Sequence, residues 1–117
     1  MDLKECYKEM DGDYDDVMTR LPREASVIKF LRRFAENGEF DELKVAAKDK
    51  DYKRVFELSH DLKGMAANLS ISAFQKTISD ICEDTRNKEP GDGFDALLSK
   101  ADEQHKKVIE AISKLED

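Results

Sequence analysis

The stretch FELSHDLKGMAANLS, residues 56–70, decides the fold because it has the spacing of one long amphipathic helix. His60 projects about 180° from the middle of the apolar stripe on this helix, so we expect its side chain to face solvent. Gly64 follows one turn later, although glycine inside a helix costs roughly 1 kcal/mol relative to alanine. The apolar stripe that we expect to be buried consists of Val55, Leu58, Leu62, Met65 and Leu69.

The rest of the chain has the same helical spacing, and the strand-like alternation of apolar residues is nearly absent. Asp51 is a plausible N-cap, and Ser72 with Gln75 has the spacing of a capping box. Short connections make the last four helices antiparallel, which predicts an all-α, up-down four-helix bundle with extra N-terminal helices. The predicted helices cover residues 13–20, 23–36, 39–49, 52–69, 71–88 and 94–115, and residues 2–9 are either helical or frayed.

The composition limits the possible classes of protein. A chain of 117 residues suits a single domain, residues 1–117, and its net charge of −7 argues against nucleic acid or an anionic membrane as the main partner. Cys6 and Cys82 form no close pair and the two histidines are far apart, so we expect reduced thiols and no metal site. No stretch is typical of a signal peptide or a membrane span, which predicts a cytoplasmic protein, and we expect a monomer.

The outward face of the helix at 52–69 carries the chemistry that we consider functional. A neutral imidazole is a good nucleophile near pH 7 and can accept a phosphoryl group, whose charge Lys63 could stabilise. Gly64 and Ala67 remove bulk beside His60, unless Gly64 serves a tight helix–helix contact, for which it would have to point inward. Phe56 is either a core residue at the edge of the bundle or a contact for a partner. The residues expected to bind a partner are Gly64, Phe56, Ala67 and Lys53.

The motif at residues 60–69 resembles the H-x-L-K-G-x-A-x-x-L signature of histidine-containing phosphotransfer (HPt) domains, and residues 10–21 and 41–60 are similar to neighbouring parts of that family. The resemblance implies that His60 is the phosphoacceptor, that Lys63 neutralises the phosphoryl group and that Gly64 gives a partner access. It further implies response-regulator receiver domains and a sensor histidine kinase as partners. The receiver would supply Mg²⁺, and this chain would have no cofactor and no autokinase or ATPase activity of its own.

Two departures from the family pattern leave questions. Many members have a glycine where this chain has Ser70, and we expect this serine to serve as the N-cap of the next helix. Many members also have an acid or amide that touches the imidazole, at a position where this chain has Cys82. Gln75 and Ser79 lie on the same flank, and the sequence does not decide which residue orients His60.

Other features have simpler interpretations. His105 falls on the apolar stripe of the last helix, where a half-buried packing residue is favoured over a second functional histidine. The acid-rich residues 11–16 favour a helix start over a Ca²⁺ site, because the EF-hand pattern is missing. Two alternatives to the phosphorelay carrier are an adaptor that binds receivers without being phosphorylated and a helical metal or catalytic protein.

Overall fold

The computed structural model describes residues 1–116, and in this range the chain is all-helical with no strand, which confirms the predicted all-α class. Its helices are α1 (Leu3–Glu9), α2 (Tyr14–Arg20), α3 (Glu24–Glu36), α4 (Glu39–Lys48), α5 (Tyr52–Asn68), α6 (Ser72–Asp84) and α7 (Phe94–Ser113). The largest difference from the predicted boundaries is at α6, which ends at Asp84 rather than near residue 88. There the Thr85 hydroxyl donates to the Ile81 carbonyl at 3.0 Å, and Asn87 adopts a positive φ of 54°.

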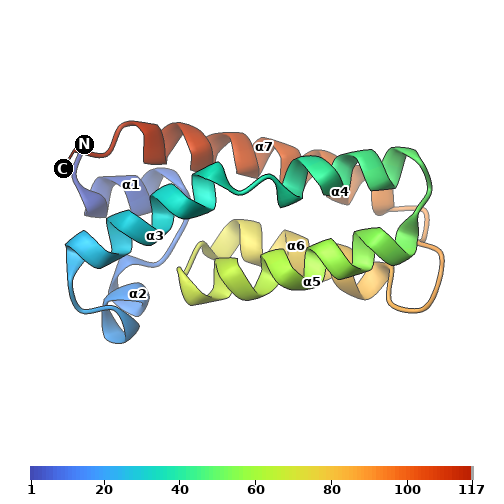
Figure 1. Cartoon of the computed structure of the whole chain (residues 1–117), viewed down its shortest axis with the longest axis horizontal. Coiled ribbons are helices and arrows are strands. Elements are labelled where there is room, and N and C mark those ends of the chain that lie inside the picture. The colour runs from blue at the N-terminus through green and yellow to red at the C-terminus, as the bar shows by residue number, and fades with distance from the viewer. Residues whose placement is uncertain (117) are drawn as a thin grey trace.

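The helices form an elongated molecule of 41 × 23 × 20 Å. α5 packs against α4 and α6, and α6 packs against α7 (Figure 1). α3 and α4 follow one another along one long side, and the two termini lie at the same end of the molecule. At that end the amino group of Met1 lies 3.4 Å from the Glu116 carboxylate.

The buried stripe of α5 differs at one position from the prediction. Val55, Leu58, Leu62 and Leu69 are buried as predicted, but Met65 is only half-buried, while Ser59 and Ala66 are fully buried. Small side chains at these two positions let neighbouring helices approach α5 closely, so the buried stripe is wider than the apolar spacing alone predicts. The assignment of Met65 to the core stripe was therefore wrong in part.

Two of the predicted helix starts are confirmed and one is wrong. Asp51 caps α5 by accepting a hydrogen bond from the Arg54 amide at 3.2 Å, and Asp13 caps α2 through the Asp16 amide at 3.0 Å. The Asp13 cap agrees with the helix-start interpretation of residues 11–16. The capping box at Ser72 does not form, because Ser72 is already the first residue of α6 and its N-cap residue makes no side-chain bond.

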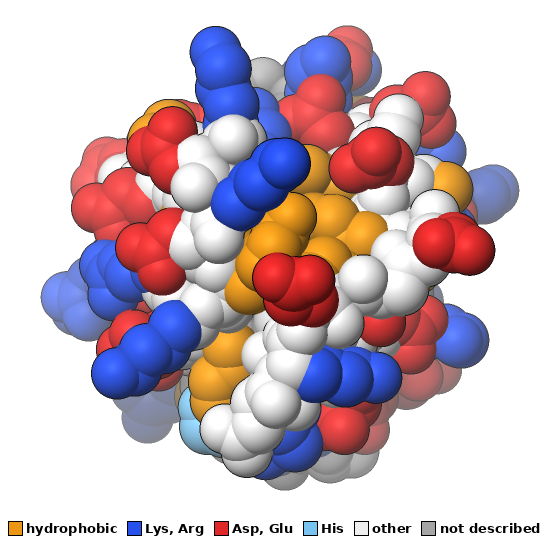
Figure 2. Space-filling view, turned by 90° about the vertical axis from the view of Figure 1, so that its right-hand side faces the viewer, with side chains coloured by type: hydrophobic (Ala, Val, Ile, Leu, Met, Phe, Trp, Pro, Cys, Tyr) orange, Lys and Arg blue, Asp and Glu red, His pale blue; other side chains and the backbone are white. Residues whose placement is uncertain are grey.

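The surface carries charged side chains of both signs. Figure 2 views the end of the molecule where α4 connects to α5 and α6 to α7, and there acidic and basic groups surround a small apolar area without forming a continuous patch of one sign. Among the described residues, Val45 is the exposed large hydrophobic residue, with 60% of its surface accessible. No helix within residues 1–116 combines the length and the apolar character that crossing a membrane requires.

Candidate functional site

α5 presents the His60 side chain to solvent, as the spacing predicts. The opposite side of the helix is held in the core by Leu58 and Leu62, which are almost fully buried. Within residues 1–116 no group hydrogen-bonds to the imidazole, and its recorded neighbour is the Phe56 ring, with centroids 6.0 Å apart. The imidazole is therefore open to a reactant from outside the protein.

Gly64 lies on the same exposed face, one turn after His60. A Cβ atom placed on Gly64 would meet nothing within 4 Å, so no neighbouring helix requires a glycine there. The alternative that Gly64 serves a tight helix–helix contact is therefore wrong. Ala67 and Lys63 are half-buried and Lys53 is exposed on the same side of α5. The unoccupied space beside His60 is a property of the surface and not a result of internal packing.

Phe56 marks the edge of this face toward α6. It is half-buried and lies outside the hydrophobic core cluster, so of the two alternatives the structure supports a surface aromatic residue. The Arg86 guanidinium lies over its ring, 4.9 Å from the centroid. Glu83 accepts a hydrogen bond from Arg86 at 3.0 Å, which lowers the pKa of the Glu83 carboxyl, and the charge of Lys63 lowers it further.

The same edge has a pocket lined by Lys53, Phe56, Thr85, Asn87 and Lys88. Arg86 and Lys88 both lie in the loop after α6, and they add two positive charges near Phe56. Sequence analysis missed both residues, because no periodicity links them to α5. The only available signal was a local excess of basic residues in the segment 86–88.

The three residues considered as partners for the imidazole do not hydrogen-bond to it. Cys82 is fully buried and belongs to the packed side of α6, whereas Gln75 and Ser79 are half-buried. No hydrogen bond joins any of the three to His60 in the described part of the chain. His60 is thus placed by the helix backbone and by its contact with Phe56, rather than by a polar partner on α6.

Ser70 does not act as an N-cap, which corrects the prediction. Ile71 occupies the N-cap position of α6, and Ser70 instead adopts a positive φ of 54°, the conformation that most favours glycine. This conformation explains why a glycine suits the position. The Ser70 side chain is 2% exposed and donates a hydrogen bond to the Asp16 carboxylate at 2.6 Å.

Arg20 of α2 completes this contact at the end of α5. Its guanidinium donates to the Ser70 hydroxyl and to the carbonyls of Ala67 at 3.1 Å and Asn68 at 3.3 Å. The hydrogen bond from Ser70 and the charge of Arg20 hold the pKa of Asp16 below its usual range. A side chain from α2 therefore caps the last turn of α5, and sequence spacing gave no sign of it because the partners are some 50 residues apart.

His105 has the opposite environment to His60. It is half-buried on α7, as predicted, and its ring lies near three phenylalanine rings. The centroid distances are 6.4 Å to Phe34, 4.6 Å to Phe40 and 5.6 Å to Phe74. Burial lowers the pKa of this imidazole. The geometry is that of a packing residue.

The described part of the chain contains no group of three or more histidine, cysteine, aspartate or glutamate side chains arranged to hold a metal ion. Comparison of the chain with protein-family models, with curated proteins and with solved structures found no match. The fold and the site therefore define an all-helical protein with an open histidine on a helix face, and its interpretation rests on these residues.

Proposed function

We propose that this chain is a phosphorelay carrier of the HPt type, with His60 as the phosphoacceptor. In this proposal α4 to α7 make up a four-helix bundle and α1 to α3 extend it. The observation that carries the proposal is the open surface at His60 and Gly64. No residue in the described range 1–116 hydrogen-bonds to the imidazole, and the glycine one turn later has no packing reason to be a glycine. Glycine inside a helix costs about 1 kcal/mol relative to alanine, and at this position it leaves space for a partner beside His60.

The reaction would be a direct transfer between His60 and an aspartate of a receiver domain. The lone pair of the unprotonated ring nitrogen attacks the phosphorus and forms a P–N bond. The P–O bond to the aspartate breaks, and its electron pair leaves on the carboxylate, so the exchange is redox-neutral. The other ring nitrogen keeps its proton. The reverse sequence passes the phosphoryl group to the next receiver.

Lys63 would stabilise the charge on the phosphoryl group. It lies one turn from His60, and its flexible ammonium group can follow the group as it moves. Mg²⁺ would come from the receiver, because the carboxylates that hold it there are not part of this chain's proposed site. The carrier would have neither ATPase nor autokinase activity and would depend on a sensor histidine kinase upstream.

Partner contact would involve the surface on both sides of His60. Gly64 and Ala67 provide a low surface, and Phe56 with Lys53 provides an aromatic and a basic edge. Aromatic residues are enriched in protein interfaces, which suits the position of Phe56. We propose that the protein works as a cytoplasmic monomer that receivers approach one at a time.

The test is a transfer assay with a matched pair of variants. Receiver domains phosphorylated with labelled acetyl phosphate are mixed with the wild type, His60→Gln or His105→Gln. We expect acid-labile, base-stable label on the wild type and on His105→Gln, and none on His60→Gln. Circular dichroism would verify that both variants fold. Label on His60→Gln would disprove the assignment, and receiver binding without any transfer to the wild type would favour the adaptor.

A further inference from the structure

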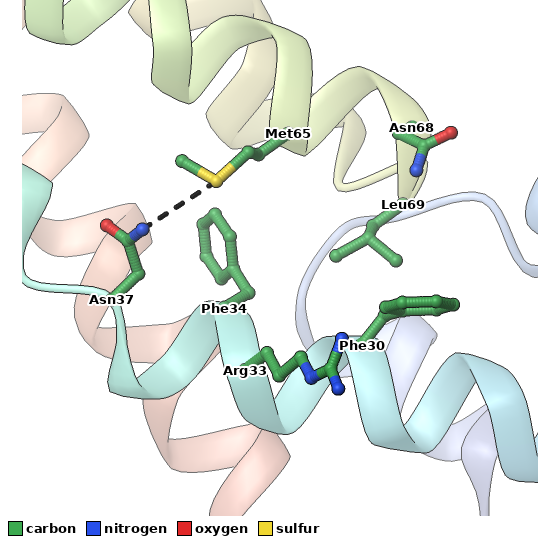
Figure 3. A pocket seen from close by; sticks show the side chains of 7 residues that line it. All are labelled: Phe30, Arg33, Phe34, Asn37, Met65, Asn68 and Leu69. Carbon is green, nitrogen blue, oxygen red and sulfur yellow. Dashed lines mark hydrogen bonds between the residues drawn. The ribbon is translucent and has the colours of Figure 1, made fainter.

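A pocket lies between α3 and α5 (Figure 3). Its floor is apolar, and Phe34 and Leu69 there are almost fully buried. Polar side chains form the rim, as Figure 3 shows for Arg33, Asn37 and Asn68. The full lining consists of Phe30, Arg33, Phe34, Asn37, Met65, Asn68 and Leu69.

The pocket is held open by contacts within the protein. The Asn37 amide donates to the Met65 sulfur at 3.8 Å, and the Asn37 side-chain oxygen accepts from the Glu39 amide at 2.8 Å. Phe34 is fixed from behind by Phe74, with ring centroids 6.0 Å apart in an edge-to-face arrangement. A preformed pocket binds a side chain with little cost in ordering, which favours a role in recognition.

The pocket lies within reach of a partner that contacts His60. Around the helix axis, Gly64 lies about 40° and Asn68 about 80° from His60, so the bare surface at Gly64 leads toward the mouth of the pocket. Asn68 is about 12 Å from His60 along the axis. An interface of ordinary size covers about 800 Å² on each partner, equivalent to a disc of about 16 Å radius. A receiver centred on His60 would therefore reach the rim of the pocket at Asn68.

The charge at the rim indicates what could enter. The Arg33 guanidinium lies 5.7 Å from the Phe30 ring centroid, and no carboxylate within residues 1–116 pairs with it. An exposed arginine beside an apolar pocket suits an apolar side chain that is flanked by an acidic group.

We propose that this pocket anchors an apolar side chain of the receiver domain that exchanges phosphate with His60, with a neighbouring acidic group of the receiver paired to Arg33. The inference rests on the proposed function and adds a docking site to it. Because the pocket does not contact the imidazole, it acts on the stability of the complex and not on the transfer step. It therefore sets which receivers bind well.

The experiment measures transfer rates as a function of receiver concentration. Each of a panel of receiver domains is phosphorylated with labelled acetyl phosphate and mixed with the wild type, Phe30→Ala, Arg33→Glu or Asn68→Phe. We expect KM to rise about tenfold in each variant with kcat unchanged, since a docking contact affects binding alone. Arg33 and Asn68 are exposed, so their substitution leaves the core intact even if Phe30→Ala fails to fold.

Two controls separate docking from other effects. Val45→Ala removes an exposed apolar side chain from α4 outside the pocket and should leave KM unchanged. Phosphoramidate, a small donor that needs no docking, should load His60 equally well in every variant.

Unchanged KM in Arg33→Glu and Asn68→Phe, with a receiver that labels the wild type, would overturn the docking site and leave the carrier function standing. A fall in kcat or in loading by phosphoramidate would also overturn it, because the residues would then act on the imidazole. If no receiver labels the wild type, the proposed function fails and the docking site fails with it.

Discussion

The two histidines differ in exposure and in the side chains that surround the ring. His60 is exposed and lies one turn from Gly64, where an added Cβ would meet nothing within 4 Å. His105 is half-buried, and its ring lies 4.6 Å from that of Phe40. A reactant could reach the first imidazole from outside, whereas the second is enclosed on the sides that these rings cover.

The local sequence alone does not distinguish the two histidines. Each has a lysine nearby, Lys63 three residues after His60 and Lys106 directly after His105. Lys106 is engaged in an ion pair with Asp102 at 3.2 Å, whereas Lys63 only lowers the pKa of Glu83 through its charge. The difference teaches that the helix face, rather than the neighbouring residue types, decides whether a histidine is available for chemistry.

The largest expected effect comes from filling the space beside His60 with a larger side chain at position 64. In Gly64→Leu the new Cβ meets nothing within 4 Å and the position is exposed, so the fold should persist. The unfolding free energy should rise by up to about 1 kcal/mol because leucine favours helix more than glycine does. Transfer from a phosphorylated receiver should fall at least about tenfold, since the leucine occupies space that the partner needs. Urea denaturation and the transfer assay measure the two effects.

The matched control is Gly93→Leu, because a Cβ at Gly93 also meets nothing within 4 Å and this residue precedes α7, far from His60 in sequence. It should leave transfer unchanged. A Gly64→Leu protein that transfers phosphate at the wild-type rate would remove the explanation of this glycine.

Much of the fold follows from periodicity. The spacing of apolar residues predicted α3 to α7, because helices that bury one stripe repeat it every three or four residues. The acidic residues at the start of α2 indicated that helix, and for residues 2–9 helix and fraying both stayed open. The errors occur where tertiary contacts determine the structure. Met65 lines a pocket, where its sulfur accepts a hydrogen bond from Asn37, and the N-cap position of α6 belongs to Ile71 and not to a serine.

The surface around His60 was predictable in part for the same reason. One helix supplies His60, Lys63, Gly64 and Ala67, so a helical wheel places them together. Arg86 and the pocket beside α3 depend on which helices lie next to α5, which no local pattern in the sequence encodes.

A second prediction concerns how the end of α5 is held in place, because no polar side chain within residues 1–116 hydrogen-bonds to His60. Ser70→Ala keeps the positive φ but removes the hydroxyl that binds Asp16 and Arg20, so we expect a loss of about 1–2 kcal/mol in the free energy of unfolding. Ser70→Gly loses the same bonds but relieves about 1 kcal/mol of backbone strain, and should lie closer to the wild type.

Urea denaturation of the two variants decides between these contributions. Equal destabilisation by alanine and glycine would mean that the backbone conformation at Ser70 carries no cost. An alanine variant as stable as the wild type would mean that the contact with α2 does not hold the end of α5.

The smallest expected effect is the contribution of His105 to the pH dependence of stability. Burial lowers the pKa of this imidazole, while Asp41 and Asp102 oppose the shift and Lys44 adds to it. The unfolded chain therefore binds a proton near pH 6.5 that the folded protein binds only at lower pH, so stability falls as pH drops through about 6.5. His105→Gln should lose this part of the pH dependence.

The measurement is urea denaturation of the wild type and His105→Gln at pH 8 and pH 5.5. Carboxylate titration is common to both proteins and cancels in the difference. If the wild type and His105→Gln lose the same stability between these pH values, the imidazole is not buried in solution and the contrast between the two histidines disappears.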